Sequence, residues 1–191
     1  MNPILAADKF TERHLYLLRA AIITLLILIA AALRVVPHPW NVTPIGAIAI
    51  FSGSLIRNRW AALLLPLATL LAGDLFIGFH QLMLVVYASF FLSVFIGRAV
   101  AQHRTIARIG GATFLGALQF FLITNFAMWA IGGFYPRTLA GLAACFAAAI
   151  PFFGNTLAGD ALYSLTLFGG YALAEKYFEL PVDHVAHQAQ D

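Results

Sequence analysis

The stretch GDLFIGFHQLMLVVYASFFL, residues 73–92, contains the end of one apolar run and the start of the next, joined by a short turn with a histidine. The two runs cover residues 60–79 and 81–101. A helix that crosses a bilayer needs about 20 mainly apolar residues. The stretch therefore predicts two membrane-spanning helices with a tight connection. It also raises the question of why Asp74 lies in so apolar a sequence.

The whole chain shares this apolar character, since 62% of its 191 residues are hydrophobic and only 10% are charged. Soluble domains carry about 25% charged residues. The composition excludes an ordinary soluble domain and predicts an integral membrane protein with a single domain. The lone cysteine, Cys145, excludes an internal disulfide and a multi-cysteine metal cluster. The basic residues form no stripe of the kind that binds nucleic acid, so no nucleic-acid partner is expected.

We expect an all-α membrane protein with six transmembrane helices. The six apolar runs are residues 15–36, 44–56, 60–79, 81–101, 109–131 and 155–174. The sequence PFFGNT, residues 151–156, is expected to break the last apolar stretch. Residues 139–150 are too few to cross a membrane, so they should form a short re-entrant or interfacial helix.

The basic residues predict the orientation of these spans, because loops on the cytoplasmic side carry an excess of Lys and Arg. With the N-terminus inside, two basic residues lie outside, Arg34 and Arg137. Nine lie inside: Lys9, Arg13, Arg19, Arg57, Arg59, Arg98, Arg104, Arg108 and Lys176. The expected layout is a cytoplasmic segment 1–13, a membrane domain 14–178 and a cytoplasmic tail 179–191.

With this orientation, the polar residues of the apolar body gather near the outer surface. Ionisable groups within membrane spans are costly and usually mark a functional site. We therefore expect an outward-facing substrate pocket with no catalytic residues, no cofactor and no dedicated metal site. The candidate substrate-binding residues are Trp40, Asn41, Asp74, Phe79, His80, Asn125, Trp129, Tyr135, Asn155 and Asp160.

Several of these residues also have simpler interpretations. Asp74 and Asp160, which both follow a glycine, could cap the N-termini of helices. His80 could be a solvated residue at the membrane interface. Catalytic motifs are missing: the sequence has neither a Gly-rich phosphate loop of the Walker type nor a His-Glu-x-x-His motif. We therefore do not expect an enzyme.

Four stretches resemble a family of small bacterial inner-membrane proteins, and that family resembles the S components of energy-coupling factor vitamin transporters, especially the solitary cobalamin-type members. These stretches are PHPWNVTPIGAIAIFSG (37–53), GDLFIGFHQLMLVVYASFFL (73–92), NFAMWAIGGFYPRTLAGL (125–142) and AIPFFGNTLAGDALYSLTLFG (149–169). The resemblance implies a multi-pass protein of the inner membrane with both termini in the cytoplasm. It also implies uptake of a vitamin or related micronutrient through a pocket under the outer loops.

The resemblance further implies an energising transporter module as a partner, beside the substrate and the lipid bilayer. S components often dock that module through an Ala-x-x-x-Ala pair on the first span, and residues 15–36 contain no such pair. This favours a solitary transporter. If the substrate is a corrinoid, His80 is a candidate axial ligand of its cobalt, with Asp74 as the partner of the other ring nitrogen. The alternatives are a non-transporting scaffold subunit and a divalent-cation permease that uses Asp74, His80 and Asp160.

Overall fold

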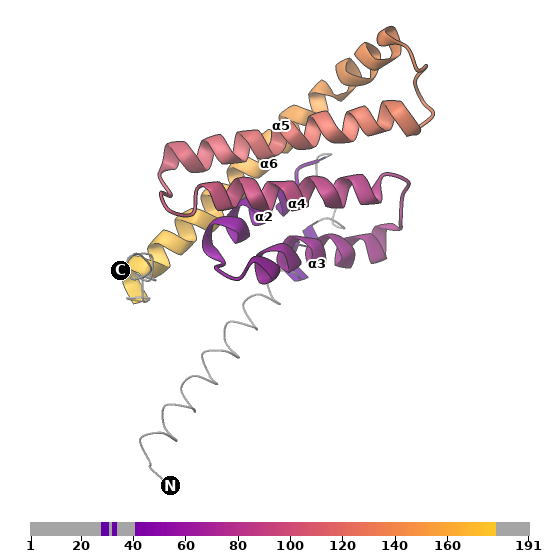
Figure 1. Ribbon diagram of the computed structural model, residues 1–191. Helices are drawn as coiled ribbons and strands as arrows, with labels where there is room; N and C mark the ends of the chain where they lie inside the picture. Colours follow the sequence, from indigo (N-terminus) through magenta and orange to yellow (C-terminus); the bar gives the residue numbers. More distant parts are fainter. Residues whose placement is uncertain (1–27, 31, 34–40, 179–191) are drawn as a thin grey trace, which may run out of the picture.

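The computed structural model describes residues 28–30, 32–33 and 41–178 of the chain. These residues are 82% helical and include no strand. Five helices follow one another after a short helical piece within residues 28–33 (Figure 1). They are α2 (Ile45–Leu55), α3 (Arg59–Ile77), α4 (Met83–Ala99), α5 (Ile106–Ile131) and α6 (Leu139–Phe178).

The expected all-α class is therefore confirmed for the described residues. Helices α2 to α5 match four of the expected spans to within a few residues at each end. Three helical segments are long and apolar enough to cross a membrane: Arg59–Ile77, Ile106–Ile131 and Leu139–Leu173. Helices α2 and α4 are apolar but shorter. Most of the first expected span, 15–36, lies outside the described residues.

The expected break at residues 151–156 is wrong, and so is the separate short helix at 139–150. Helix α6 runs without interruption through Pro151. A proline removes one backbone hydrogen bond, but the neighbouring peptide groups still need partners, which a helix supplies in an apolar environment. At 40 residues, α6 is about 60 Å long, roughly twice the thickness of the hydrocarbon core. It crosses α5 obliquely (Figure 1).

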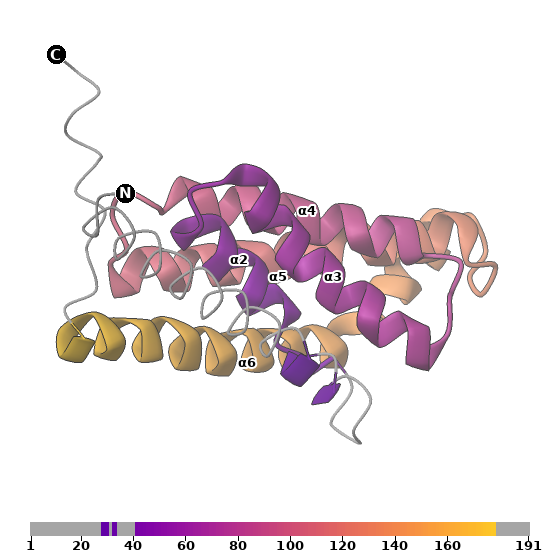
Figure 2. The same cartoon turned by 90° about the horizontal axis from the view of Figure 1, so that it is seen from below.

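Helix α2 lies at the centre of the bundle. It lies among the other four described helices (Figure 2). It contacts each of them, and nine of its eleven residues are buried. Glycines allow α4 to approach it closely. A β-carbon on Gly53 would overlap the carbonyl oxygen of Val94, and one on Gly97 would overlap the carbonyl oxygen of Ile50. Small residues commonly permit such close contacts between membrane helices.

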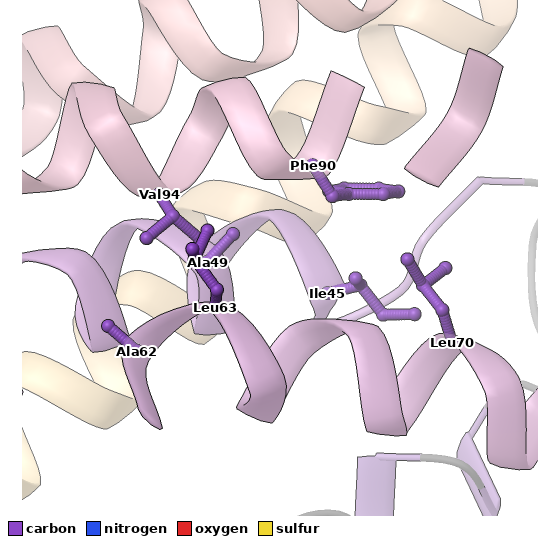
Figure 3. Packing of buried hydrophobic residues seen from close by; sticks show 7 residues of the cluster. All are labelled: Ile45, Ala49, Ala62, Leu63, Leu70, Phe90 and Val94. Carbon is purple, nitrogen blue, oxygen red and sulfur yellow. The ribbon is translucent and has the colours of Figure 1, made fainter. Parts of the chain in front are cut away.

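The main apolar core joins α2, α3 and α4. Figure 3 shows side chains from these helices packed together: Ile45, Ala49, Ala62, Leu63, Leu70, Phe90 and Val94. Helices α5 and α6 contribute less to the interior, because only 17% of the most apolar window of each is buried. The outer faces of these two helices are rich in exposed leucine and phenylalanine, as expected for surfaces in contact with lipid.

The two ends of the bundle differ in charge. One end, where α2 and α4 finish and α3 and α5 begin, holds six of the seven basic residues of the described part: Arg57, Arg59, Arg98, Arg104, Arg108 and Lys176. The other end holds Arg137, in the connection between α5 and α6. The antiparallel helices thus gather the basic residues that are separated along the chain.

Two of these arginines bind the C-terminal end of α2. Arg98 donates to the carbonyl oxygens of Ile56 and Arg57, at 3.1 and 3.3 Å, and Arg104 donates to that of Ser54 at 3.2 Å. The last carbonyl groups of a helix lack partners within it and carry partial negative charge. Arg98 and Arg104 therefore stabilise this end of α2.

Candidate functional site

Two adjoining cavities lie toward the end of the bundle opposite the basic end. The larger has a volume of about 430 Å³ and lies between the C-terminal half of α5 and the N-terminal half of α6. The smaller, of about 180 Å³, lies between the start of α2 and its neighbours. Both are lined by Asn41, Phe120 and Thr156, so these three residues mark the boundary between them.

The start of α2 supplies one wall of the smaller cavity. Pro44, at the N-cap position of α2, makes no side-chain capping bond. A carboxylate from another helix takes this role: Asp160 of α6 accepts a hydrogen bond from the backbone N–H of Ala47. A negative charge is favourable at a helix N-terminus, where unpaired N–H groups carry partial positive charge. Asp160 thus caps α2, although it belongs to α6.

Glycine is required where the two helices meet. A β-carbon on Gly46 would overlap both carboxylate oxygens of Asp160. The Asp160 side chain is 5% exposed, and it lines the smaller cavity together with His80 and Thr43. Among the described residues that line the two cavities, Asp160 is the one acidic side chain, and none is Lys or Arg.

Hydroxyl and amide groups of the larger cavity are bonded to their own helices. Thr124 donates to the carbonyl oxygen of Phe120 at 2.7 Å, and the amide nitrogen of Asn125 donates to that of Phe121 at 2.8 Å. Thr156 donates in the same way to Phe152, at 2.9 Å. These bonds use the hydroxyl protons of both threonines and one of the two amide protons of Asn125. Oxygen lone pairs therefore remain as acceptors.

Five of the ten residues predicted from the sequence line these cavities: Asn41, His80, Asn125, Tyr135 and Asp160. Asn41 adopts a positive φ of 65°, which asparagine tolerates better than most residues. Trp40 lies outside the described residues. The cobalt-ligand role of His80 stays a prediction.

The other four predicted residues are placed elsewhere. Asp74 lies in the last turn of α3, fully buried, and accepts a hydrogen bond of 2.9 Å from the Tyr87 hydroxyl. Its interpretation as a helix N-cap is therefore wrong. Phe79 is exposed in the turn between α3 and α4, and Asn155 is half-buried on α6. The Trp129 indole donates to the carbonyl oxygen of Pro136 at 3.0 Å and so fixes the connection between α5 and α6.

Sequence reasoning missed three phenylalanines of the larger cavity's lining, Phe120, Phe121 and Phe152. Phe120 and Phe121 of α5 and Phe152 of α6 line the larger cavity with Phe134 and Phe153. Their spacing is that of any lipid-facing helix, so no local signal separates them from other phenylalanines. Sequence reasoning also missed Gln119, whose amide nitrogen bonds Ser93 at 2.8 Å and the Ser89 carbonyl at 2.9 Å, while its buried oxygen has no partner within the described structure.

No group of three His, Cys, Asp or Glu side chains suited to a metal ion occurs within residues 28–30, 32–33 and 41–178. Comparison with curated proteins and with proteins of solved structure finds no match. Residues 16–183 match DUF6580, described as a family of unknown function. This match covers most of the chain and includes every helix described above. The chain therefore belongs to the DUF6580 family.

Proposed function

We propose that the protein is a substrate-binding membrane transport protein of the S-component type, which captures a small vitamin-like solute. The observation that carries the proposal is the pair of cavities between Asn125 and Asp160. Ligand sites commonly occupy about 300–1,000 Å³, with mostly apolar walls and a few polar groups that fix orientation. The larger cavity, of about 430 Å³, falls in this range and has such walls.

The distribution of charge supports an orientation for uptake. The end that carries six basic residues faces the cytoplasm in this proposal, in line with the bias of membrane proteins toward positive inner loops. The cavities lie toward the other end and so would open to the periplasmic side of the inner membrane. The resemblance to S components leads to the same orientation. It adds six spans and both termini in the cytoplasm.

The cavity volumes favour a compact solute. A corrinoid is larger than either cavity, so it would bind only if the outer loops moved apart. A vitamin with a single ring system fits the larger cavity as it stands, and its polar end would extend toward Asn41 and Thr156, where the two cavities adjoin.

The decisive experiment is mass spectrometry of small molecules that co-purify with the detergent-solubilised protein. We expect a compound enriched with the wild type and reduced at least several-fold with Asn125→Ala, because Asn125 lines the larger cavity. Asn155→Ala is the matched control, since Asn155 lies on α6 outside both cavity linings. If the wild type and a folded Asn125→Ala variant retain the same compounds equally, the proposed site is wrong.

A further inference from the structure

We propose that the ligand of this site is an organic cation with N–H donors and a flat apolar body, whose charged end binds Asp160. This inference rests on the proposed substrate-binding function and specifies the chemical class of the substrate. The flat body would lie in the larger cavity, and the cationic end would pass Asn41 and Thr156 to reach the smaller one.

The first argument is charge. Asp160 is 5% exposed and lines the smaller cavity, and among the described residues that line the two cavities none is Lys or Arg and His80 is the one basic side chain. A buried carboxylate is costly unless it is paired and hydrogen-bonded. The N–H of Ala47 supplies one hydrogen bond from the start of α2. A cationic ligand would supply the missing positive charge on the side of the cavity.

The second argument is hydrogen bonding. Thr124, Asn125 and Thr156 donate to carbonyl groups of their own helices. Their oxygens therefore face a ligand mainly as acceptors. Along the path from the larger cavity to Asp160, this arrangement favours a ligand that donates hydrogen bonds. An ammonium or amidinium group has several hydrogen-bond donors and no acceptor. A carboxylate or phosphate would instead place its own acceptor oxygens against the acceptor oxygens of the cavity.

The third argument is shape. The ring centroids of Phe121 and Phe153 are 4.9 Å apart, and both residues line the larger cavity. Phe120 lines both cavities and Phe90 lines the smaller one, with their ring centroids 5.0 Å apart. Aromatic faces favour flat ring systems and attract cations through their electron-rich faces. The walls thus suit the apolar body, and the rings beside Asp160 suit the positive end.

Three indole compounds of matched size test the inference: tryptamine, which is a cation at neutral pH, tryptophol, which is neutral, and indole-3-acetate, which is an anion. The measurement is the shift in melting temperature of the full-length detergent-solubilised protein at increasing concentrations of each compound, since a ligand of the folded state raises its stability. We expect tryptamine to bind about tenfold more tightly than the other two, the usual size of a hydrogen-bonded charge contribution.

Asp160→Asn keeps the size of the side chain and removes its charge, so it should abolish the preference for tryptamine over tryptophol. Asp74→Asn is the matched control, because Asp74 is buried but lies outside both cavity linings, and it should keep the preference. If Asp160→Asn does not fold, the inference is still tested by the wild-type protein, through the order in which the three compounds raise its melting temperature. Equal or stronger stabilisation by tryptophol or indole-3-acetate, or none by tryptamine at millimolar concentration, would overturn the inference.

The proposed function is judged separately, by the compound that co-purifies with the wild type. A neutral or anionic compound that depends on Asn125 would support the substrate-binding function and overturn the cation inference. A compound with a basic amine or a fixed positive charge, lost from Asp160→Asn but kept by Asp74→Asn, would support both. The absence of any compound enriched with the wild type, together with no stabilisation by the indoles, would contradict both.

Discussion

The carboxylate of Asp160, in the middle of α6, occupies the space that a β-carbon on Gly46 would fill at the start of α2. This contact lets the carboxylate reach the N–H of Ala47 and cap a helix to which it does not belong. At the other end of α2, Arg98 and Arg104 bind carbonyl groups. The short central helix is thus held at its two ends by opposite charges that match the helix dipole.

Gly46→Ala should destabilise the protein, because the new methyl group would force Asp160 out of its position. Overpacking of this kind costs about 1–3 kcal/mol, and the loss of the cap adds to it. Gly111→Ala is the matched control on α5, where a β-carbon meets no atom of the described residues within 4 Å; it should be neutral or slightly stabilising. Thermal unfolding in detergent measures both. Equal melting temperatures for the two variants would contradict the close contact.

Arg98→Met should lower stability by about 1.5–3 kcal/mol, the usual contribution of hydrogen bonds to charged groups. The change removes the bonds to the carbonyl oxygens of Ile56 and Arg57 and keeps most of the side-chain volume. Arg108→Met removes a positive charge from an exposed position at the same end of the bundle and should change stability little. Chemical denaturation of the two variants side by side tests the difference. An equal loss of stability in Arg98→Met and Arg108→Met would show that net charge, and not the hydrogen bonds of Arg98, causes the effect.

Tyr87→Phe should destabilise the protein by about 1–3 kcal/mol, because it removes a donor from a buried carboxylate. Tyr163→Phe is the control, since the Tyr163 hydroxyl has no hydrogen bond within the described structure. Ligand binding by folded Tyr87→Phe should stay at the wild-type level, because Asp74 lies outside both cavity linings. A binding defect without a stability defect would instead give Asp74 a functional role.

The proposed orientation predicts which exposed positions can be labelled from outside intact cells. With Cys145 replaced by alanine, a cysteine at Ala140, in the first turn of α6, should react with a membrane-impermeant maleimide. A cysteine at Gln102, in the exposed turn between α4 and α5, should react only after the cells are permeabilised. Labelling of Gln102→Cys from outside would reverse the orientation and place the cavities on the cytoplasmic side.

Much of the fold follows from local sequence. The apolar runs predicted α2 to α5 to within a few residues, because the length and hydrophobicity of a membrane helix are properties of one segment. The prediction failed at PFFGNT, residues 151–156, where proline and glycine indicate a break in soluble proteins. Within an apolar bundle the helix continues, because an interrupted backbone would leave peptide groups without partners. Proline and glycine are therefore weaker indicators of a helix break inside α6 than they are in soluble proteins.

The candidate site followed from the sequence only in part. The rarity of charge singled out Asp74 and Asp160 equally, since both follow Ala-Gly in an apolar run. Which of them faces a cavity depends on neighbours far away along the chain. The Tyr87 hydroxyl donates a hydrogen bond to the carboxylate of Asp74. Gly46, which has no side chain, leaves space for the carboxylate of Asp160 beside the smaller cavity.

The sequence by itself determined that this is a helical membrane protein with most of its basic residues toward one end, because the hydrophobicity and the charge of each segment follow from its own residues. Only the tertiary structure decided that α2 is the buried centre and that Asp160 caps it from α6. It also decided which phenylalanines of α5 and α6 line a cavity. These features depend on close contacts between helices that are distant in sequence. The residues next to a glycine or a phenylalanine in the chain do not indicate which side chain it will contact in the fold.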